Sequence, residues 1–325
     1  MDSSLVSLVC YGNGYLAGKR WQYEPVGFST KHGDYFFVRP RDNAAPDEEV
    51  ATSPEGWFAW LAAAGAQGLR IAHTPGKNEH NRVWMMNGVV KAIEVLYPGD
   101  ESEFWTSYLD FPRDPYPITP LPEFPRLEIG PALRDPSLFK SWLRDAAVWP
   151  AIYVRTSIKR IPEIHAKLSH PNLPPQKPWK YMHRLEERGP TDAIVLPDLA
   201  SLTADLKKVL VEIREFAIRT NAGFIENFTG ALDVLDEREA PAWAELARDG
   251  LLTPEAVRLL SACGKAWVFG GMMSWNDNPH SLPDDPQERI AVEADYDRVT
   301  AALYMVVSRA IVAAANSSCK VAHGA

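Results

Sequence analysis

The chain has 325 residues, of which 46% are hydrophobic and 23% are charged, an ordinary composition for a soluble globular protein. It argues against a disordered or fibrous chain, and apolar runs such as 59–66 and 310–315 are far shorter than the ~20 residues that span a bilayer. The net charge of −8 disfavours non-specific binding to nucleic acid or anionic membranes and favours a cationic partner.

The N-terminus and the cysteines favour a cytoplasmic location. The chain begins with an acidic residue, Asp2, rather than a basic segment, and it has no clear cleavage site, so we expect no secretory signal. Its three cysteines, Cys10, Cys263 and Cys319, are odd in number and widely spaced, which suits neither a disulfide framework nor a metal site. We therefore expect a reducing compartment and no metal or other cofactor.

The first predicted elements form a small sheet with one helix. Short β-like runs alternate with glycine and charged turns at 5–10, 34–38 and 70–73. A helix is predicted over 53–66, because Ser53 can accept from first-turn amides, Pro54 suits the first helical position and Glu55 complements the helix dipole. Residues 1–111 are therefore expected to form an N-terminal α+β lobe.

A hairpin and a proline-rich connector complete the first half. The pair Asn87-Gly88 separates the runs 82–86 and 89–96, and it tolerates the positive φ angles of a tight hairpin turn. Eight prolines fall within 112–136. Because proline lacks an amide donor, neither a long helix nor a central strand persists at that density. We expect 112–136 to connect two lobes.

The second half, 137–325, predicts a helix-rich α+β lobe with short strands. A long basic loop is expected to contain a short helix at 181–188. Apolar residues recur at three- and four-residue intervals over 206–217, which is typical of an amphipathic helix. Thr253 starts another helix with the pattern seen at Ser53. A buried strand is predicted at 266–269.

The longest helix is predicted over 293–316, with an apolar stripe that includes Val299, Leu303 and Val306. The predicted fold class is therefore α+β in two lobes: a small mixed sheet with a helix, followed by a helix-rich part that ends in a long helix.

Catalytic fingerprints are missing from the sequence. It contains no Gly-x-Gly-x-x-Gly, Walker loop, Gly-x-Ser-x-Gly or His-Glu-x-x-His. The segment Lys265–His280 is the most distinctive, because an apolar run delivers Gly270 and Gly271, then Trp275 and the short polar residues that follow it. This pattern is compatible with a binding site at the end of a strand, or with simple tight packing in which Trp275 fills the core.

Three segments near the C-terminus form a recognisable pattern. They are Trp267-Val-Phe-Gly-Gly-Met-Met-Ser-Trp-Asn-Asp277, Tyr296-Asp-Arg-Val-Thr-Ala-Ala-Leu-Tyr304, and an alanine-rich helix ending at Ser318. The pattern resembles an immunity-protein family of bacterial polymorphic-toxin systems, and the whole chain is similar in size and layout to immunity proteins of type VI secretion systems. The resemblance implies a non-enzymatic protein that binds a toxin, typically a restriction-endonuclease-like DNase, in a 1:1 complex.

The charge distribution suggests where such a toxin would bind. Residues 221–325 carry 15 acidic and 8 basic side chains, and a nuclease has a cationic groove that attracts an acidic surface. The candidate partner interface combines an aromatic anchor with two acidic groups: Trp275, Asn276, Asp277, Asp284, Asp285, Glu288, Asp233, Asp236, Glu237 and Glu239.

Three alternatives remain open at this point. The basic stretch 155–188 is a second possible interface, which would suit an acidic partner surface. A hydrolase or transferase would place its site around Gly270–His280, with Asp277 or His280 as the base. A scaffolding protein would instead show a large apolar patch without a strong charge bias.

Overall fold

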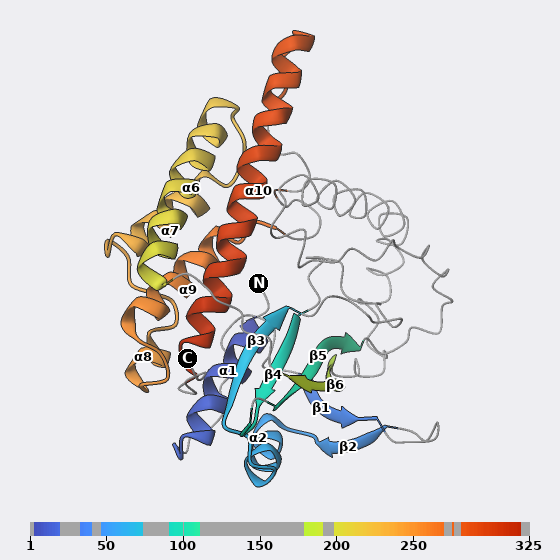
Figure 1. Ribbon diagram of the computed structural model, residues 1–325. Helices are drawn as coiled ribbons and strands as arrows, with labels where there is room; N and C mark the ends of the chain where they lie inside the picture. Colours follow the sequence, from blue (N-terminus) through green and yellow to red (C-terminus); the bar gives the residue numbers. More distant parts are fainter. Residues whose placement is uncertain are drawn as a thin grey trace, which may run out of the picture.

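The computed structural model describes residues 3–19, 33–40, 47–73, 91–99, 101–110, 179–190, 198–269, 275 and 281–319. These residues form a six-stranded mixed sheet and, beside it, a bundle of helices (Figure 1). The strands are β1 (Gly33–Arg39), β2 (Glu48–Ala51), β3 (Gly68–His73), β4 (Lys91–Leu96), β5 (Glu101–Asp110) and β6 (Trp179–Pro190). Their order is β2-β1-β6-β5-β4-β3, with β1 and β6 parallel and every other pair antiparallel.

Two helices, α1 (Ser3–Leu16) and α2 (Pro54–Ala63), pack on the sheet. Trp57 of α2 is fully buried, and its ring stacks on Phe37 of β1 at a centroid distance of 4.5 Å. Its edge meets Trp105 of β5 at 5.4 Å. His183 of β6 is buried in the same aromatic layer, 4.6 Å from Phe37. Aromatic packing of this kind holds β1, β5 and β6 beneath α2.

Strand β3 lies at one edge of the sheet, and two asparagine side chains satisfy its outer backbone groups. Asn13 of α1 accepts from the Leu69 amide at 2.7 Å and donates to the Leu69 carbonyl at 2.8 Å. Asn316 accepts from the Ile71 amide at 2.7 Å and donates to the Ile71 carbonyl at 3.0 Å. Each amide side chain thus replaces one peptide group of a missing strand. Ser318 connects the two ends of the chain, since Asn13 also donates to its hydroxyl at 2.7 Å.

The remaining helices form the bundle. They are α6 (Leu199–Arg219), α7 (Ile225–Leu235), α8 (Ala244–Arg248), α9 (Pro254–Ala266) and α10 (Pro286–Asn316). Helix α10 packs on α6 and α9 through its middle and reaches β3 and α1 with its C-terminal end (Figure 1). It therefore joins the bundle to the sheet. Among the described residues it alone is long and apolar enough to cross a membrane, and 72% of its apolar window is buried, as in the core helix of a soluble protein.

The α+β fold class with a helix-rich C-terminal part is confirmed. Helix α2 begins as expected, because Ser53 accepts from the Gly56 amide at 3.1 Å, and α9 begins at Thr253 in the same way. Strands at 34–38 and 70–73 and the helix over 206–217 are also confirmed. The Asn87-Gly88 turn and the connector at 112–136 lie outside the described residues.

Three predicted elements are wrong. Residues 5–10 belong to helix α1, because a run that is buried at every position carries no periodicity to distinguish helix from strand. Residues 181–188 form a strand, since β6 pairs with β1 and β5 on its two sides. Residue 266 ends α9, and 267–269 are irregular rather than a strand.

Two boundaries also need correction. Helix α10 starts at Pro286, seven residues before the predicted start at 293. The sheet is not built from residues 1–111 alone, because β6 comes from beyond residue 137 and lies between β1 and β5. The strands of the described sheet thus come from both sides of 112–136.

Removal of the Asn316 amide tests the role of the sheet edge. We expect Asn316→Ala to lower the free energy of unfolding by about 2 kcal/mol, because the amide and carbonyl of Ile71 lose their partners in a partly buried site. Asn227→Ala is the matched control: its amide contacts the Lys265 carbonyl at 3.4 Å on the exposed surface, and we expect a change of about 0.5 kcal/mol or less. Urea unfolding measures the free energy of unfolding of both variants. Equal losses in the two variants would contradict the role of Asn316 in stabilising the edge of the sheet.

Candidate functional site

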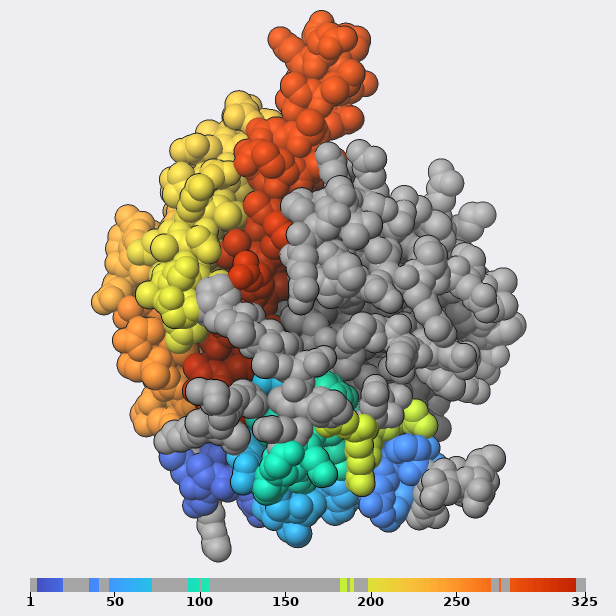
Figure 2. Space-filling model, in the orientation of Figure 1, coloured from blue at the N-terminus to red at the C-terminus, as the bar shows by residue number. Residues whose placement is uncertain are grey.

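The N-terminal end of α10 projects beyond the rest of the bundle (Figure 1, Figure 2). Every residue from Pro286 to Ala291 is exposed, and Tyr296 is the first buried residue of the helix. These six residues span about 9 Å at 1.5 Å per residue, and the ten helical residues that precede Tyr296 span about 15 Å. We call residues 281–295 the α10 projection. It contains three of the predicted interface residues, Asp284, Asp285 and Glu288.

The start of the α10 projection is strongly capped. The Asp285 carboxylate accepts hydrogen bonds from the amides of Gln287 and Glu288 at 2.8 and 2.9 Å. Pro286 occupies the first helical turn, where its fixed φ suits the helix and its missing N–H costs nothing. These local interactions favour the helical conformation at Pro286–Ala291, where every residue is exposed.

The α10 projection presents negative charge to solvent. Between residues 281 and 295 there are five acidic residues and one basic residue. The basic one, Arg289, turns back to the Pro283 carbonyl at 3.3 Å. Within the part of the chain that the structure describes, no cation pairs with Asp284 or Glu288. These two carboxylates are therefore available to a partner.

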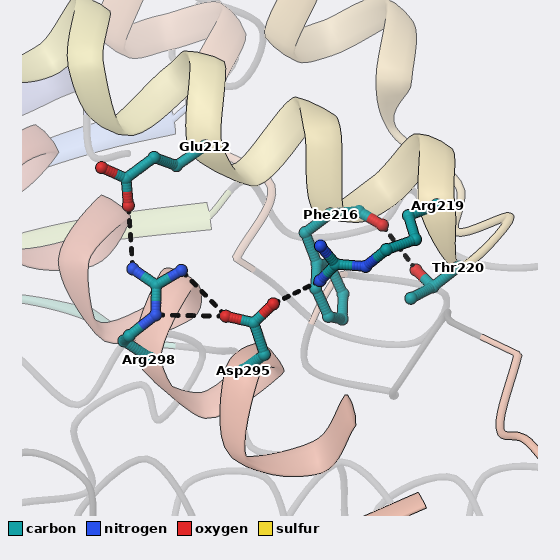
Figure 3. A network of polar contacts seen from close by, with 6 residues as sticks. All are labelled: Glu212, Phe216, Arg219, Thr220, Asp295 and Arg298. Carbon is teal, nitrogen blue, oxygen red and sulfur yellow. Dashed lines mark hydrogen bonds and ion pairs between the residues drawn. The ribbon is translucent and has the colours of Figure 1, made fainter. Parts of the chain in front are cut away.

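Four charged side chains fix the base of the projection (Figure 3). Arg298 of α10 donates to Glu212 of α6 at 2.8 Å and to Asp295 at 2.8 and 3.1 Å. Asp295 also accepts from Arg219 at the end of α6, and this guanidinium lies 5.5 Å from the ring centre of Phe216. The chain Glu212–Arg298–Asp295–Arg219 thus crosses between α6 and α10 where the projection leaves the bundle.

The charge network lowers the pKa of Asp295. Partial burial alone would raise this pKa, but the hydrogen bonds and charges of Arg298 and Arg219 outweigh it and hold the pKa below its usual value. The hydrogen bonds to Glu212 and Asp295 in turn raise the pKa of Arg298. Ionised Asp295 therefore stabilises the folded state.

Trp275 does not lie on this surface. Its side chain is fully buried, so the prediction of an exposed aromatic anchor is wrong for this residue. The indole N–H donates to Thr300 Oγ1 at 2.8 Å, and the Trp275 carbonyl accepts from the Tyr296 hydroxyl at 2.5 Å. The ring lies among aromatic side chains of α10, α6, α7 and the residue before α7, namely Tyr296, Phe216, Phe228 and Phe224. Trp275 is a core residue of the bundle.

The second predicted acidic group, at the end of α7, is neutralised within the molecule. Each of its four carboxylates forms an ion pair: Asp233 with Arg238, Asp236 with Lys207 and Arg238, Glu237 with Arg258, and Glu239 with Lys265. The hydrogen bond from Lys207 is the main reason that the pKa of Asp236 lies below its usual value. These residues hold α7 against α6 and α9 and present less free charge than the α10 projection does.

Two predicted interface residues, Asn276 and Asp277, lie outside the described residues, as does most of the segment Gly270–His280. Among the residues that are described, no three His, Cys, Asp or Glu side chains come together to hold a metal ion. The structure therefore brings Asp284, Asp285 and Glu288 together in one element and separates them from Trp275 and from the α7 group.

The sequence prediction missed the network partners Glu212, Arg219 and Arg298. It also missed Ile290, which is 61% exposed on the α10 projection. A usable signal was present, because Asp285-Pro286 is the same helix-start pattern as Ser53-Pro54. That pattern places 286–292 in the helix even though no apolar stripe marks those residues.

The chain was compared with protein families, curated proteins and solved structures. No protein-family model, no curated protein and no solved structure matches the chain. The function must therefore be inferred from the charge, exposure and contacts of the described residues.

Truncation of Trp275 tests its place in the core. We expect Trp275→Ala to lower the free energy of unfolding by about 3–5 kcal/mol, because it empties a fully buried site and leaves Thr300 without its donor. Trp275→Phe keeps most of the ring contacts and should cost less. Thermal or urea unfolding measures the stability of both variants. A Trp275→Ala protein as stable as the wild type would contradict the core position of Trp275.

The network makes a pH-dependent prediction. Asp295→Asn should lower stability at pH 7 by about 1 kcal/mol, the usual scale for partly exposed ion pairs. Since the folded pKa of Asp295 is depressed, its contribution is complete above the unfolded value near 4 and is lost as pH falls through the folded value. The difference from wild type should therefore shrink at pH 3 in urea unfolding. Glu293→Gln, on the same helix, is the control and should change little at either pH.

Proposed function

We propose that this chain is an immunity protein that binds a toxic nuclease in a 1:1 complex and neutralises it without chemistry of its own. The observation that supports the proposal best is the α10 projection, a preformed helix end with carboxylates that pair with no cation among the described residues. The proposed toxin is an effector delivered by a type VI secretion system, in keeping with the resemblance of the C-terminal pattern to immunity proteins.

Electrostatics favour this kind of partner. A nuclease must attract a polyanion, so the groove that binds nucleic acid carries positive charge. A chain with net charge −8 and an acidic projection gains long-range attraction to such a groove, which raises the association rate and makes it sensitive to salt. The acidic group at α7 contributes less to this attraction because its own cations screen it.

The contacts of Trp275 argue against one use of the same segment by an enzyme. The rival hypothesis places Asp277 or His280 as the base of such an enzyme, and both residues lie outside the described part of the chain. The contacts of Trp275 bear only on whether its ring could stack on a substrate there. That ring is fully buried, and its indole N–H is engaged by Thr300. It is therefore not free to stack on a substrate.

The function is tested with the product of the neighbouring gene, which we expect to be a nuclease. We expect the purified chain to form a 1:1 complex with a catalytically inactive form of that nuclease, measured by light scattering after gel filtration. Co-expression should also protect cells from the active nuclease. Cells killed by the nuclease despite full expression of the chain would remove the immunity function.

Charge reversal distinguishes the two predicted acidic groups. Asp284→Lys with Glu288→Lys should slow association with that nuclease by on the order of tenfold at low salt, because steering depends on unpaired surface charge. Asp285 is left unchanged, since it caps α10. The matched control, Glu237→Lys with Glu239→Lys, changes the net charge equally at residues already paired with cations and should have a smaller effect. Association rates are measured by stopped flow. Equal rates for the two double variants would contradict the assignment of the α10 projection as the steering surface.

A further inference from the structure

Large hydrophobic side chains are seldom exposed in the described part of the chain, and two of them lie on the α10 projection. Four are exposed by more than a third: Val211 37%, Ile218 58%, Leu282 43% and Ile290 61%. Ile290 is the most exposed of the four. Single exposed hydrophobic residues are common on protein surfaces, so its meaning depends on where it lies.

Ile290 points away from the bundle. It precedes Val299, which is buried in the bundle, by nine residues, or about two and a half helical turns, so the two side chains lie on opposite sides of α10. With 61% of its surface exposed, Ile290 contributes little to the packing of the described residues. Glutamate at 293 and alanine at 294 flank it within one turn, and both are exposed.

The charge around Ile290 restricts what can cover it. A two-fold contact between two copies of the chain would bring the same helix end, with Asp284 and Glu288, against itself. Like charges that meet across an interface cost free energy, so the acidic surroundings disfavour a second copy. They favour a basic surface with an apolar depression at its centre, which is the usual anatomy of a tight interface.

We infer that the α10 projection is a helix-in-groove docking element whose exposed Ile290 inserts into an apolar pocket rimmed by lysine and arginine on the toxin. The inference rests on the proposed function and names the contact through which it acts. The carboxylates of Asp284 and Glu288 raise the rate of association, and the buried Ile290 side chain then slows dissociation of the toxin.

Preorganisation supports this role. The Asp285 cap and Pro286 hold the first turn, while the network of Arg298 with Asp295 and Glu212 fixes the base of the helix to α6. Little conformational entropy remains to be lost when the projection enters a groove. A rigid helix end also keeps Ile290 and Glu288 in a fixed relation, two residues apart and about 200° around the helix axis from each other.

The experiment compares two isoleucines of similar exposure on different helices. Ile290→Ser and Ile218→Ser are made in the full chain, and the rates of association and dissociation are measured with the purified, catalytically inactive nuclease encoded beside the gene. Ile290→Ser should raise Kd by at least about tenfold, mainly through faster dissociation. Ile218→Ser should change Kd by less than about threefold. Circular dichroism and thermal unfolding confirm that both variants are folded, which their exposure favours.

The outcomes separate the two proposals. If the wild-type chain binds the nuclease but Ile290→Ser binds as tightly as wild type, or no more weakly than Ile218→Ser, the docking role of Ile290 is wrong and the immunity function stands. If the wild-type chain neither binds the nuclease nor protects cells from it, the immunity function is wrong and the docking role falls with it. An increase in Kd confined to Ile290→Ser supports both.

Discussion

The two asparagine side chains that close the edge of β3 hold the described parts of this protein together. Backbone groups at a sheet edge destabilise the fold if they are buried without hydrogen-bond partners. If they are exposed, they can pair with a strand of another molecule. Asn13 satisfies Leu69 and Asn316 satisfies Ile71, so one edge strand is completed by side chains from the first and the last helix. These asparagines belong to α1 and α10. The hydrogen bonds that complete the sheet edge therefore also attach both helices to the sheet, and α10 connects the sheet to the helical bundle. Close packing reinforces this attachment, since a Cβ at Gly12 of α1 would overlap the Leu69 side chain.

Helix α10 divides into three parts with different roles. Its last turns lie on the sheet edge, its middle is buried against α6 and α9, and its first turns stand clear of the bundle. The buried middle supplies the stability that the exposed first turns lack, and the Glu212–Arg298–Asp295–Arg219 network marks the transition between them. A helix held firmly at one end and free at the other is well suited to present side chains to a partner. This arrangement and the net negative charge support the function proposed for the chain.

What the sequence could predict depended on how local the signal was. Helix starts at Ser53 and Thr253 were predictable, because the cap and the following proline act within one turn. The strand identity of β6 was not, since it comes from pairing with β1 and β5 rather than from its own residues. Asn13 and Ser318 lie 305 residues apart, and nothing in either neighbourhood reveals their contact. In the candidate site, composition indicated the carboxylates of the α10 projection, but their separation from the paired α7 group and the burial of Trp275 required the tertiary structure.

Amide hydrogen exchange of the full chain, alone and in complex with the inactive nuclease, shows whether the nuclease covers the α10 projection. Exposed helix ends exchange through local fraying, so coverage by a partner slows their exchange markedly. We expect protection on binding to be concentrated at 284–294, with little change at 233–239. Protection concentrated at 233–239, or a complex in which 284–294 exchanges as fast as in the free chain, would contradict it.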